Sequence, residues 1–158
     1  MRRRKTRVEN IRHCGDGEHA VVSLLSTSDG KGWNRREPCE QCPWRKDLPT
    51  GTFPAEAFRI SANTSYDAAL NTFACHMHGS EKPSTCAGFL LKNADNNLGV
   101  RIAAMRGDIK LPITDGGFPL YDDYRAMAIA NGVSPDDEAL TLCRGNHDSY
   151  RRPKRRKR

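Results

Sequence analysis

Four of the six cysteines have the spacing of metal ligands. Cys39 and Cys42 are separated by two residues, and a proline stands on each side of the pair. A Cys-x-x-Cys turn points both sulfurs at one centre, about 2.3 Å from each when that centre is zinc. Cys75 and Cys86 follow further along the chain. The pattern therefore predicts a four-coordinate metal site made by Cys39, Cys42, Cys75 and Cys86.

Other ligands and other metals fit the same pattern. Either His76 or His78 can replace one thiolate, which gives a site of three cysteines and one histidine. A cubane iron–sulfur cluster also takes four cysteines, and spacing does not separate it from zinc. We favour zinc as the commoner occupant of such a turn, and keep the iron–sulfur cluster as the alternative. A metal-free redox dithiol is disfavoured, because residues 33–38 lack the pattern of the buried strand that precedes such a motif.

Cys14 and Cys143 remain outside this set. Each has one histidine nearby, His13 and His147 respectively, and the two pairs together could form a second metal site. Nothing in the sequence brings the two ends together. We therefore expect Cys14 and Cys143 to be free thiols.

Basic residues at the two ends form the second chemical feature. The formal net charge is +7, yet residues 14–150 carry 13 Lys and Arg against 18 Asp and Glu. The excess of positive charge therefore belongs to the ends. The residues that we expect to contact nucleic acid are Arg2, Arg3, Arg4, Lys5, Arg7, Arg151, Arg152, Lys154, Arg155, Arg156, Lys157 and Arg158.

Such dense positive charge is typical of segments that bind phosphates. Each cation that contacts a phosphate releases condensed counterions, so binding weakens steeply with salt. Neither end contains an aromatic residue that could stack on a base. The ends therefore predict attraction to nucleic acid, most simply DNA, without base reading. A solubilising tail or a nuclear localisation signal has the same composition and remains the alternative.

The chain has no apolar run of about 18 residues, which a membrane-spanning helix requires. Its first residues are basic, with no apolar segment after them that would make an export signal. We therefore expect an intracellular protein, in the cytoplasm or nucleoid of a cell, that has no membrane partner.

Turn and helix signals predict the elements that position these residues. Two partly β-branched runs, 8–11 and 19–25, flank a Gly-Asp-Gly turn and predict a hairpin. Thr52 is expected to cap a helix that begins near Pro54. Helical spacing predicts further helices over 65–72, 86–91, 98–105, 120–131 and 134–143. We interpret the last pair as an ordinary αα-hairpin and not as a DNA-binding helix-turn-helix. The second helix begins with three carboxylates, which would face the phosphates of DNA if it were a recognition helix.

These elements predict a mainly α protein with a short N-terminal β-hairpin, a small metal-stabilised domain with disordered basic ends. The expected organisation has three parts. A basic arm covers residues 1–13, and a basic tail covers 151–158. Between them lies a single metal-binding domain, 14–150, with a cysteine core over 37–93 and a helical part over 94–150.

The cysteine segments resemble a poorly characterised family of short phage and bacterial proteins. The resemblance is carried by Pro-Cys-x-x-Cys-Pro-Trp-Arg at 38–45, by Cys-His at 75–76 and by Cys-Ala-Gly at 86–88. It covers residues 37–93, about a third of the chain. It implies a metal site and a phage or prophage context, and it implies no mechanism.

Together these observations predict a zinc-stabilised, nucleic-acid-associated regulatory protein. We expect a phage-encoded DNA-binding protein or transcription regulator that acts with the host transcription machinery, and we assign no catalytic residue. One alternative is an enzyme, either an iron–sulfur redox protein or a metal-dependent nuclease that uses His76, His78 or His147. Another is a protein-binding inhibitor of a host factor, for which the basic ends are incidental.

Overall fold

A computed structural model describes residues 7–25, 34–77 and 83–144. Within these ranges the chain forms three strands, five α-helices and one 3-10 helix. The strands are β1 (Arg7–His13), β2 (Ala20–Leu25) and β3 (Asn71–Phe73). The helices are α1 (Ala55–Ser61), η1 (Ala62–Ser65), α2 (Ala87–Lys92), α3 (Leu98–Met105), α4 (Tyr124–Ala130) and α5 (Glu138–Thr141).

The three strands form one antiparallel sheet in the order β1-β2-β3. The predicted N-terminal hairpin is confirmed as β1 and β2. Its turn contains Gly17 at φ +74°, a backbone conformation that glycine adopts without steric cost. The register shifts between Val8 and Asn10, which leaves Glu9 as an extra residue in β1.

The prediction of a mainly α protein is wrong. The described chain is a small α+β fold whose helices are only four to eight residues long. The helix expected over 65–72 is instead the end of η1 followed by β3. Asn97 explains part of the difference, because its side-chain amide donates to the carbonyls of Thr64 and Asn71. Hydrogen bonds to distant residues can override the helix preference that the local spacing of apolar residues indicates. They cannot be predicted from a short stretch of sequence.

Two other helices also differ from expectation. The helix expected over 120–131 is confined to α4, which begins where the Asp123 carboxylate accepts from the backbone N–H of Ala126 at 2.8 Å. The helix expected over 134–143 is only the single turn of α5.

Thr52 does not cap α1, because its hydroxyl donates to the carbonyl of Pro49 and α1 starts after Pro54. The expected helices over 86–91 and 98–105 are present as α2 and α3.

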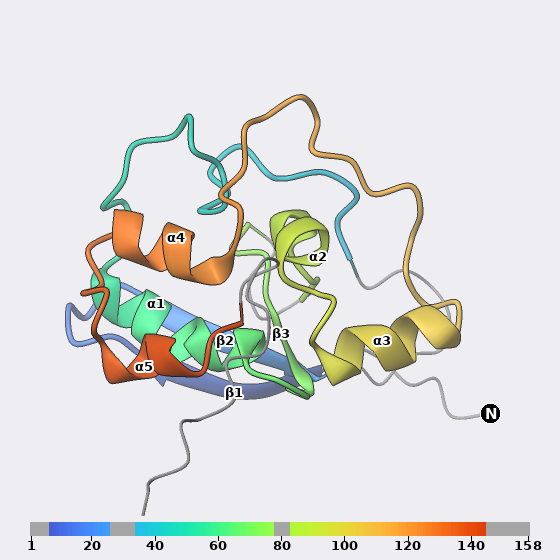
Figure 1. Ribbon diagram of the computed structural model, residues 1–158, viewed down its shortest axis with the longest axis horizontal. Helices are drawn as coiled ribbons and strands as arrows, with labels where there is room; N and C mark the ends of the chain where they lie inside the picture. Colours follow the sequence, from blue (N-terminus) through green and yellow to red (C-terminus); the bar gives the residue numbers. More distant parts are fainter. Residues whose placement is uncertain (1–6, 26–33, 78–82, 145–158) are drawn as a thin grey trace, which may run out of the picture.

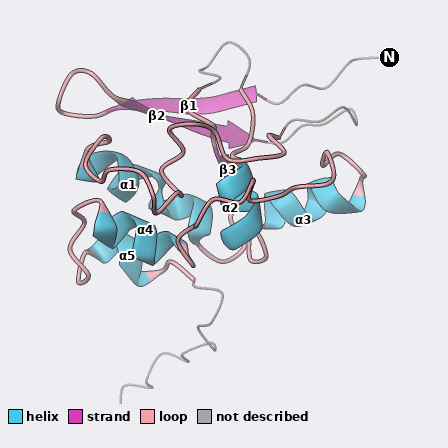
Figure 2. Cartoon of the chain, turned by 90° about the horizontal axis from the view of Figure 1, so that it is seen from above, coloured by secondary structure: helices cyan, strands magenta, loops and turns pink. Residues whose placement is uncertain are grey.

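The elements are stacked in layers, as Figures 1 and 2 show. The sheet lies on one side of the molecule, α1 packs beside it, and α4 and α5 lie beyond α1. Helix α2 lies near the centre, and α3 begins beside the start of β3, where the N–H of Gly99 donates to Ala69 O at 3.2 Å. None of the helices within the described ranges is long and apolar enough to span a bilayer.

An aromatic cluster forms the centre of the core. Trp44 and Phe73 contact each other, and each also contacts Phe89 and Tyr124. The ring centroids are 6.0 Å apart for both Trp44–Phe73 and Trp44–Tyr124. Both pairs are edge-to-face, an arrangement that aromatic rings prefer. The buried Tyr124 hydroxyl donates to the carbonyl of Phe58 at 2.6 Å, which ties α4 to α1.

Candidate metal centre

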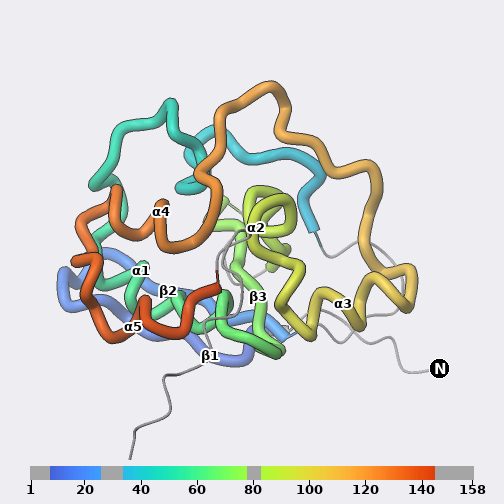
Figure 3. Tube along the Cα trace, viewed as in Figure 1, coloured from blue at the N-terminus to red at the C-terminus, as the bar shows by residue number. Residues whose placement is uncertain are grey.

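The two cysteines of the Cys-x-x-Cys turn are buried in the core. The N–H of Cys42 donates to the carbonyl of Cys39 at 3.1 Å, and the N–H of Arg45 donates to the carbonyl of Cys42 at 3.0 Å. The segment then runs beside residues 111–123, as the tube in Figure 3 shows. Two backbone hydrogen bonds, Lys46 N to Pro119 O and Tyr121 N to Trp44 O, join the segments. The turn is therefore held from a distant part of the chain.

Arg45 braces the turn from its own side. Its Nη1 lies 3.4 Å from the carbonyl oxygens of both Cys39 and Glu40. The guanidinium also forms a bidentate ion pair with Asp47, at 2.6 and 2.9 Å, and stacks 3.6 Å from the centroid of the Phe118 ring. Charge-assisted, bidentate contacts of this kind fix orientation as well as adding energy. Arg45 therefore orients the carbonyls that close the cysteine turn.

Cys75 and Cys86 reach the same place on two paired segments. The N–H of Cys75 donates to Ser84 O at 2.7 Å, and the N–H of Cys86 donates to Phe73 O at 2.9 Å. An antiparallel bridge between Ala74 and Thr85 lies between these two bonds. Cys86 is also the N-cap residue of α2. The backbone pairing brings the two cysteines together although they are not neighbours in sequence.

The four cysteines are buried in the same core cluster. The Sγ atoms of Cys42 and Cys86 are 3.6 Å apart, and the Cys39 thiol lies near enough to those of Cys42 and Cys75 for each to affect its pKa. No cysteine of the cluster is more than 5% exposed. For comparison, tetrahedral zinc with bonds of about 2.3 Å places sulfurs about 3.8 Å apart. The spacing of the closest pair is thus near that of two ligands of one zinc ion.

His76 lies at the edge of the thiol cluster. Its Nδ1 is 3.8 Å from Cys39 Sγ, and its Nε2 is buried without a partner among the described residues. Burial and the nearby charge of Arg35 lower the pKa of His76, which favours the neutral imidazole that binds metals. His76 is therefore within reach as an alternative ligand. The other predicted alternative, His78, lies outside the described residues.

The thiols stabilise one another in the protonated form. Hydrogen bonding with Cys42 raises the pKa of Cys39, and hydrogen bonding with Cys39, followed by burial, raises that of Cys75. For Cys42 the hydrogen bond with Cys39 acts in the opposite direction, yet contact with Cys86 and burial raise its pKa overall. A metal ion would therefore have to displace protons when it binds.

Within the described residues, no group of three or more His, Cys, Asp and Glu side chains is arranged as a ready metal site. One pair of the four thiols, Cys42 and Cys86, is in direct contact, with the sulfurs 3.6 Å apart. What the structure shows is a buried cluster of four reduced cysteines. Its occupation by a metal belongs to the proposal below.

Cys14 and Cys143 have separate surroundings, and both are free cysteines. Cys14 lies at the hairpin turn, where its N–H donates to His19 O. The Cys143 thiol donates to the carbonyls of Ala62 and Ala139, and burial raises its pKa to about 12. The two cysteines thus lie in different parts of the fold, each bonded to nearby segments. His147, the other predicted component of a second site, lies outside the described residues.

The predicted nucleic-acid contacts at 2–5 and 151–158 also lie outside the described residues. Of the expected basic arm, residues 7–13 form β1. Sequence reasoning did not assign roles to Trp44, Arg45 and Gly88, although all three stand in the motifs that carry the resemblance. Their position next to the cysteines was the available signal.

Residues 34–144 match the model of a family described as a family of unknown function, DUF6283. The match covers more than half of the chain, so the chain belongs to this family. No curated protein and no solved structure matches it.

Proposed function

We propose that the protein is a zinc-stabilised, nucleic-acid-associated regulatory protein. Zinc is bound by Cys39, Cys42, Cys75 and Cys86, and its role is structural. The observation that carries this proposal is the burial of four reduced thiols from three separate segments in one cluster. A closed site of four thiolates leaves no open position for substrate, which favours a structural role over a nuclease.

The geometry of the cluster favours a single ion over an iron–sulfur cubane. In a cubane each cysteine binds a different iron atom, so the ligand sulfurs stand around a large cluster. The 3.6 Å contact between the Cys42 and Cys86 sulfurs is too short for that arrangement and suits two ligands of one ion. Iron with sulfide in the purified protein is the result that would reverse this choice.

The nucleic-acid part of the proposal rests on charge. Basic residues at both ends flank an acidic body, which is the composition expected of arms that bind phosphates while the body contacts another protein. The cysteine motifs resemble those of phage and bacterial proteins, which supports the proposal that the protein is phage-encoded. The partner that we propose for the body is the host transcription machinery. The site of action is then the host cytoplasm or nucleoid.

The salt dependence of duplex DNA binding tests the proposal. We compare the full chain with a variant in which the seven basic residues of 151–158 are replaced by glutamine, which keeps the length of the chain. Each phosphate contact adds about −0.9 to the slope of log affinity against log salt. The full chain should have the steeper slope. Equal slopes for the two proteins would overturn the proposed role of the tail and favour a protein-binding inhibitor.

A further inference from the structure

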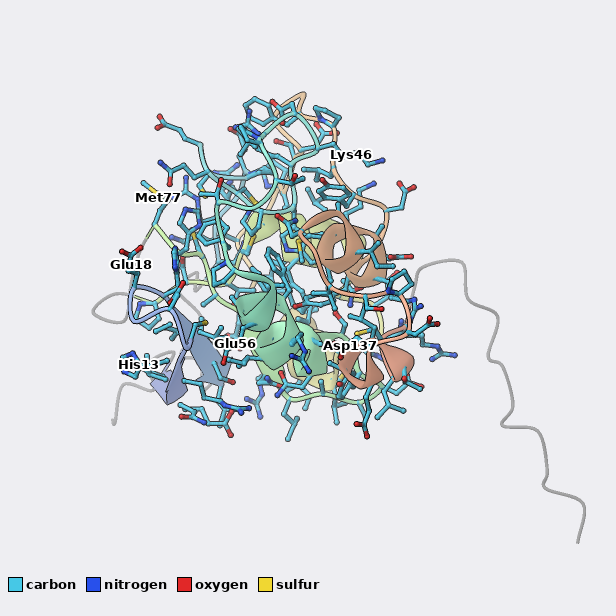
Figure 4. The ribbon with its side chains drawn as sticks, turned by 90° about the vertical axis from the view of Figure 1, so that its left-hand side faces the viewer. His13, Glu18, Lys46, Glu56, Met77 and Asp137 are labelled. Carbon is cyan, nitrogen blue, oxygen red and sulfur yellow. The ribbon has the colours of Figure 1, made fainter. Side chains whose placement is uncertain are left out.

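A cavity of about 680 Å³ lies between the β1–β2 hairpin and α1. Figure 4 shows the two elements side by side, with His13 and Glu18 on the hairpin and Glu56 on α1. Cys75 and His76 contribute to the wall, so the cavity borders the thiol cluster. Its volume falls in the range of about 300–1,000 Å³ that is typical of small-molecule sites.

Three phenylalanine residues contribute to the wall. Phe53, Phe58 and Phe73 all line the cavity. Phe53 meets the imidazole of His19 at 5.9 Å and that of His76 at 5.0 Å, both edge-to-face. Rings held in this way offer surfaces against which a planar ligand can pack.

Two amide side chains of the cavity have hydrogen-bonding atoms to spare. Asn71 Nδ2 donates to Ser23 Oγ at 3.2 Å and to Asn63 Oδ1 at 3.0 Å. Ser23 Oγ in turn donates to Glu9 Oε2 at 3.2 Å. Within the described part of the chain, no hydrogen bond occupies Asn71 Oδ1 or Asn63 Nδ2. One acceptor and one donor are therefore left for a ligand, as in the amide groups that read base edges.

Arg12 adds a positive charge to the same cavity. It lies on β1 opposite Val21, and both residues line the cavity. Arg12 is exposed, and its guanidinium makes no ion pair with any residue in the described ranges. A guanidinium without a carboxylate partner can bind a phosphate through two parallel hydrogen bonds.

We propose that this cavity binds one nucleobase together with its phosphate. The phenylalanine rings pack against the base, Asn63 and Asn71 meet its edge, and Arg12 binds the phosphate. The inference rests on the proposed nucleic-acid function, and it supplies the base-stacking surface that both basic ends lack. The same chemistry is offered by a free nucleotide and by one unpaired base of a single strand.

Binding to three probes separates these sources. The probes are the four nucleoside 5′-monophosphates, a short single-stranded DNA, and a strand of the same length whose sugars carry no bases. Calorimetric titration of the full chain should show at least about fivefold tighter binding to the normal strand than to the abasic strand, since one stacked base contributes that much. Saturable binding of a monophosphate with equal strand affinities would assign the cavity to a free nucleotide. No monophosphate binding and equal strand affinities would overturn the proposal.

A variant that fills the cavity tests its location. Ala57 lines the cavity from α1, so Ala57→Trp should abolish the preference for the normal strand while affinity for the abasic strand stays unchanged. Ala104→Trp, on an exposed position of α3, is the matched control and should keep the preference. Arg12→Gln, compared with Arg101→Gln on α3, tests the phosphate contact without adding bulk to the interior, and it should weaken binding of the monophosphates. A preference that survives Ala57→Trp, or monophosphate binding that Arg12→Gln leaves unchanged, would overturn the assignment.

The same titrations keep this inference apart from the function on which it rests. If the basic ends do not bind nucleic acid, replacing residues 151–158 will leave the affinity for the abasic strand unchanged. The cavity variants would still change monophosphate binding, because that readout does not depend on the tail.

Discussion

Gly88 lies directly against Trp44: a Cβ atom at position 88 would stand 2.6 Å from the Cβ of Trp44. The contact joins the first residues of α2 to the segment that follows the cysteine turn. Because Cys86 precedes α2 and Cys42 precedes Trp44, the close approach fixes the distance between two cysteines of the cluster. Only a residue without a side chain fits there.

Gly88→Ala should therefore disturb the thiol cluster as well as the core. Overpacking of this kind costs about 1–3 kcal/mol of unfolding free energy. We expect weaker zinc binding, measured by competition with a chelator. The control is Gly17→Ala in the hairpin turn, which is strained by its φ of +74° but has open space around it. Gly17→Ala should lose stability and keep its zinc affinity, and a similar zinc affinity for both variants would contradict the prediction.

Cys39→Ser should release the metal. Loss of one of four thiolates removes most of the binding energy of a structural zinc site, so zinc content measured by elemental analysis should fall from about one per chain towards zero. Cys143→Ser makes the same chemical change at another buried thiol, outside the cluster. It should keep its zinc. Retention of zinc in both variants would show that Cys39 is not a ligand.

Arg45→Lys should weaken metal binding although Arg45 is not itself a metal ligand. Lysine cannot reproduce the bidentate pair with Asp47, the stacking on Phe118 and the contact with two carbonyls of the turn. Groups that orient metal ligands typically contribute about 10–100-fold in affinity. Asp47→Asn leaves the contacts of Arg45 to the turn in place, so its effect on a chelator titration should be smaller. If Asp47→Asn weakened metal binding as much as Arg45→Lys, the ion pair with Asp47 alone would account for the contribution of Arg45.

Tyr124→Phe should change how stability depends on pH. Burial raises the pKa of Tyr124 well above its ordinary value of 10.0, while the hydrogen bond with Ser61 opposes the shift. The neutral phenol therefore stabilises the fold fully below pH 10.0, and this contribution is lost as the pH rises above that value. The variant should be less stable at neutral pH by about 1–2 kcal/mol, because buried hydrogen bonds are lost.

Above pH 10.0 the stability of Tyr124→Phe should decline less steeply than that of the natural chain, as denaturant titrations on either side of that pH would show. Some decline should remain, since burial also raises the pKa of Tyr66 and of Cys143. Parallel curves for the two proteins would mean that Tyr124 does not titrate during alkaline unfolding.

Local signals in the sequence were sufficient where the structure depends on local geometry. The hairpin follows from two β-branched runs around a glycine turn, and α3 follows from helical spacing that ends before Gly107 at φ +73°. The cysteine turn is equally local, since two residues between Cys39 and Cys42 determine it. These parts were predictable because each is specified within one short, continuous segment of the chain.

The remaining features depend on contacts between distant segments. β3 has only three residues, too few for a periodic pattern, and it is a strand because β2 pairs with it. Arg45, which holds the cysteine turn, stacks on Phe118, a residue 73 positions further along the chain. No pattern within one segment contains that information. The same limit explains why the fold class was predicted with too much helix.

The position of β1 at the edge of the sheet has a consequence for the behaviour of concentrated solutions. An exposed edge strand invites pairing with another copy of the chain, the first step of aggregation. Here the edge carries an extra residue, Glu9, that interrupts regular pairing, and the charged Arg12 lies on the same strand. Both features discourage strand addition. No other described strand pairs with the outer edge of β1, and these two features should keep that edge from starting fibril formation.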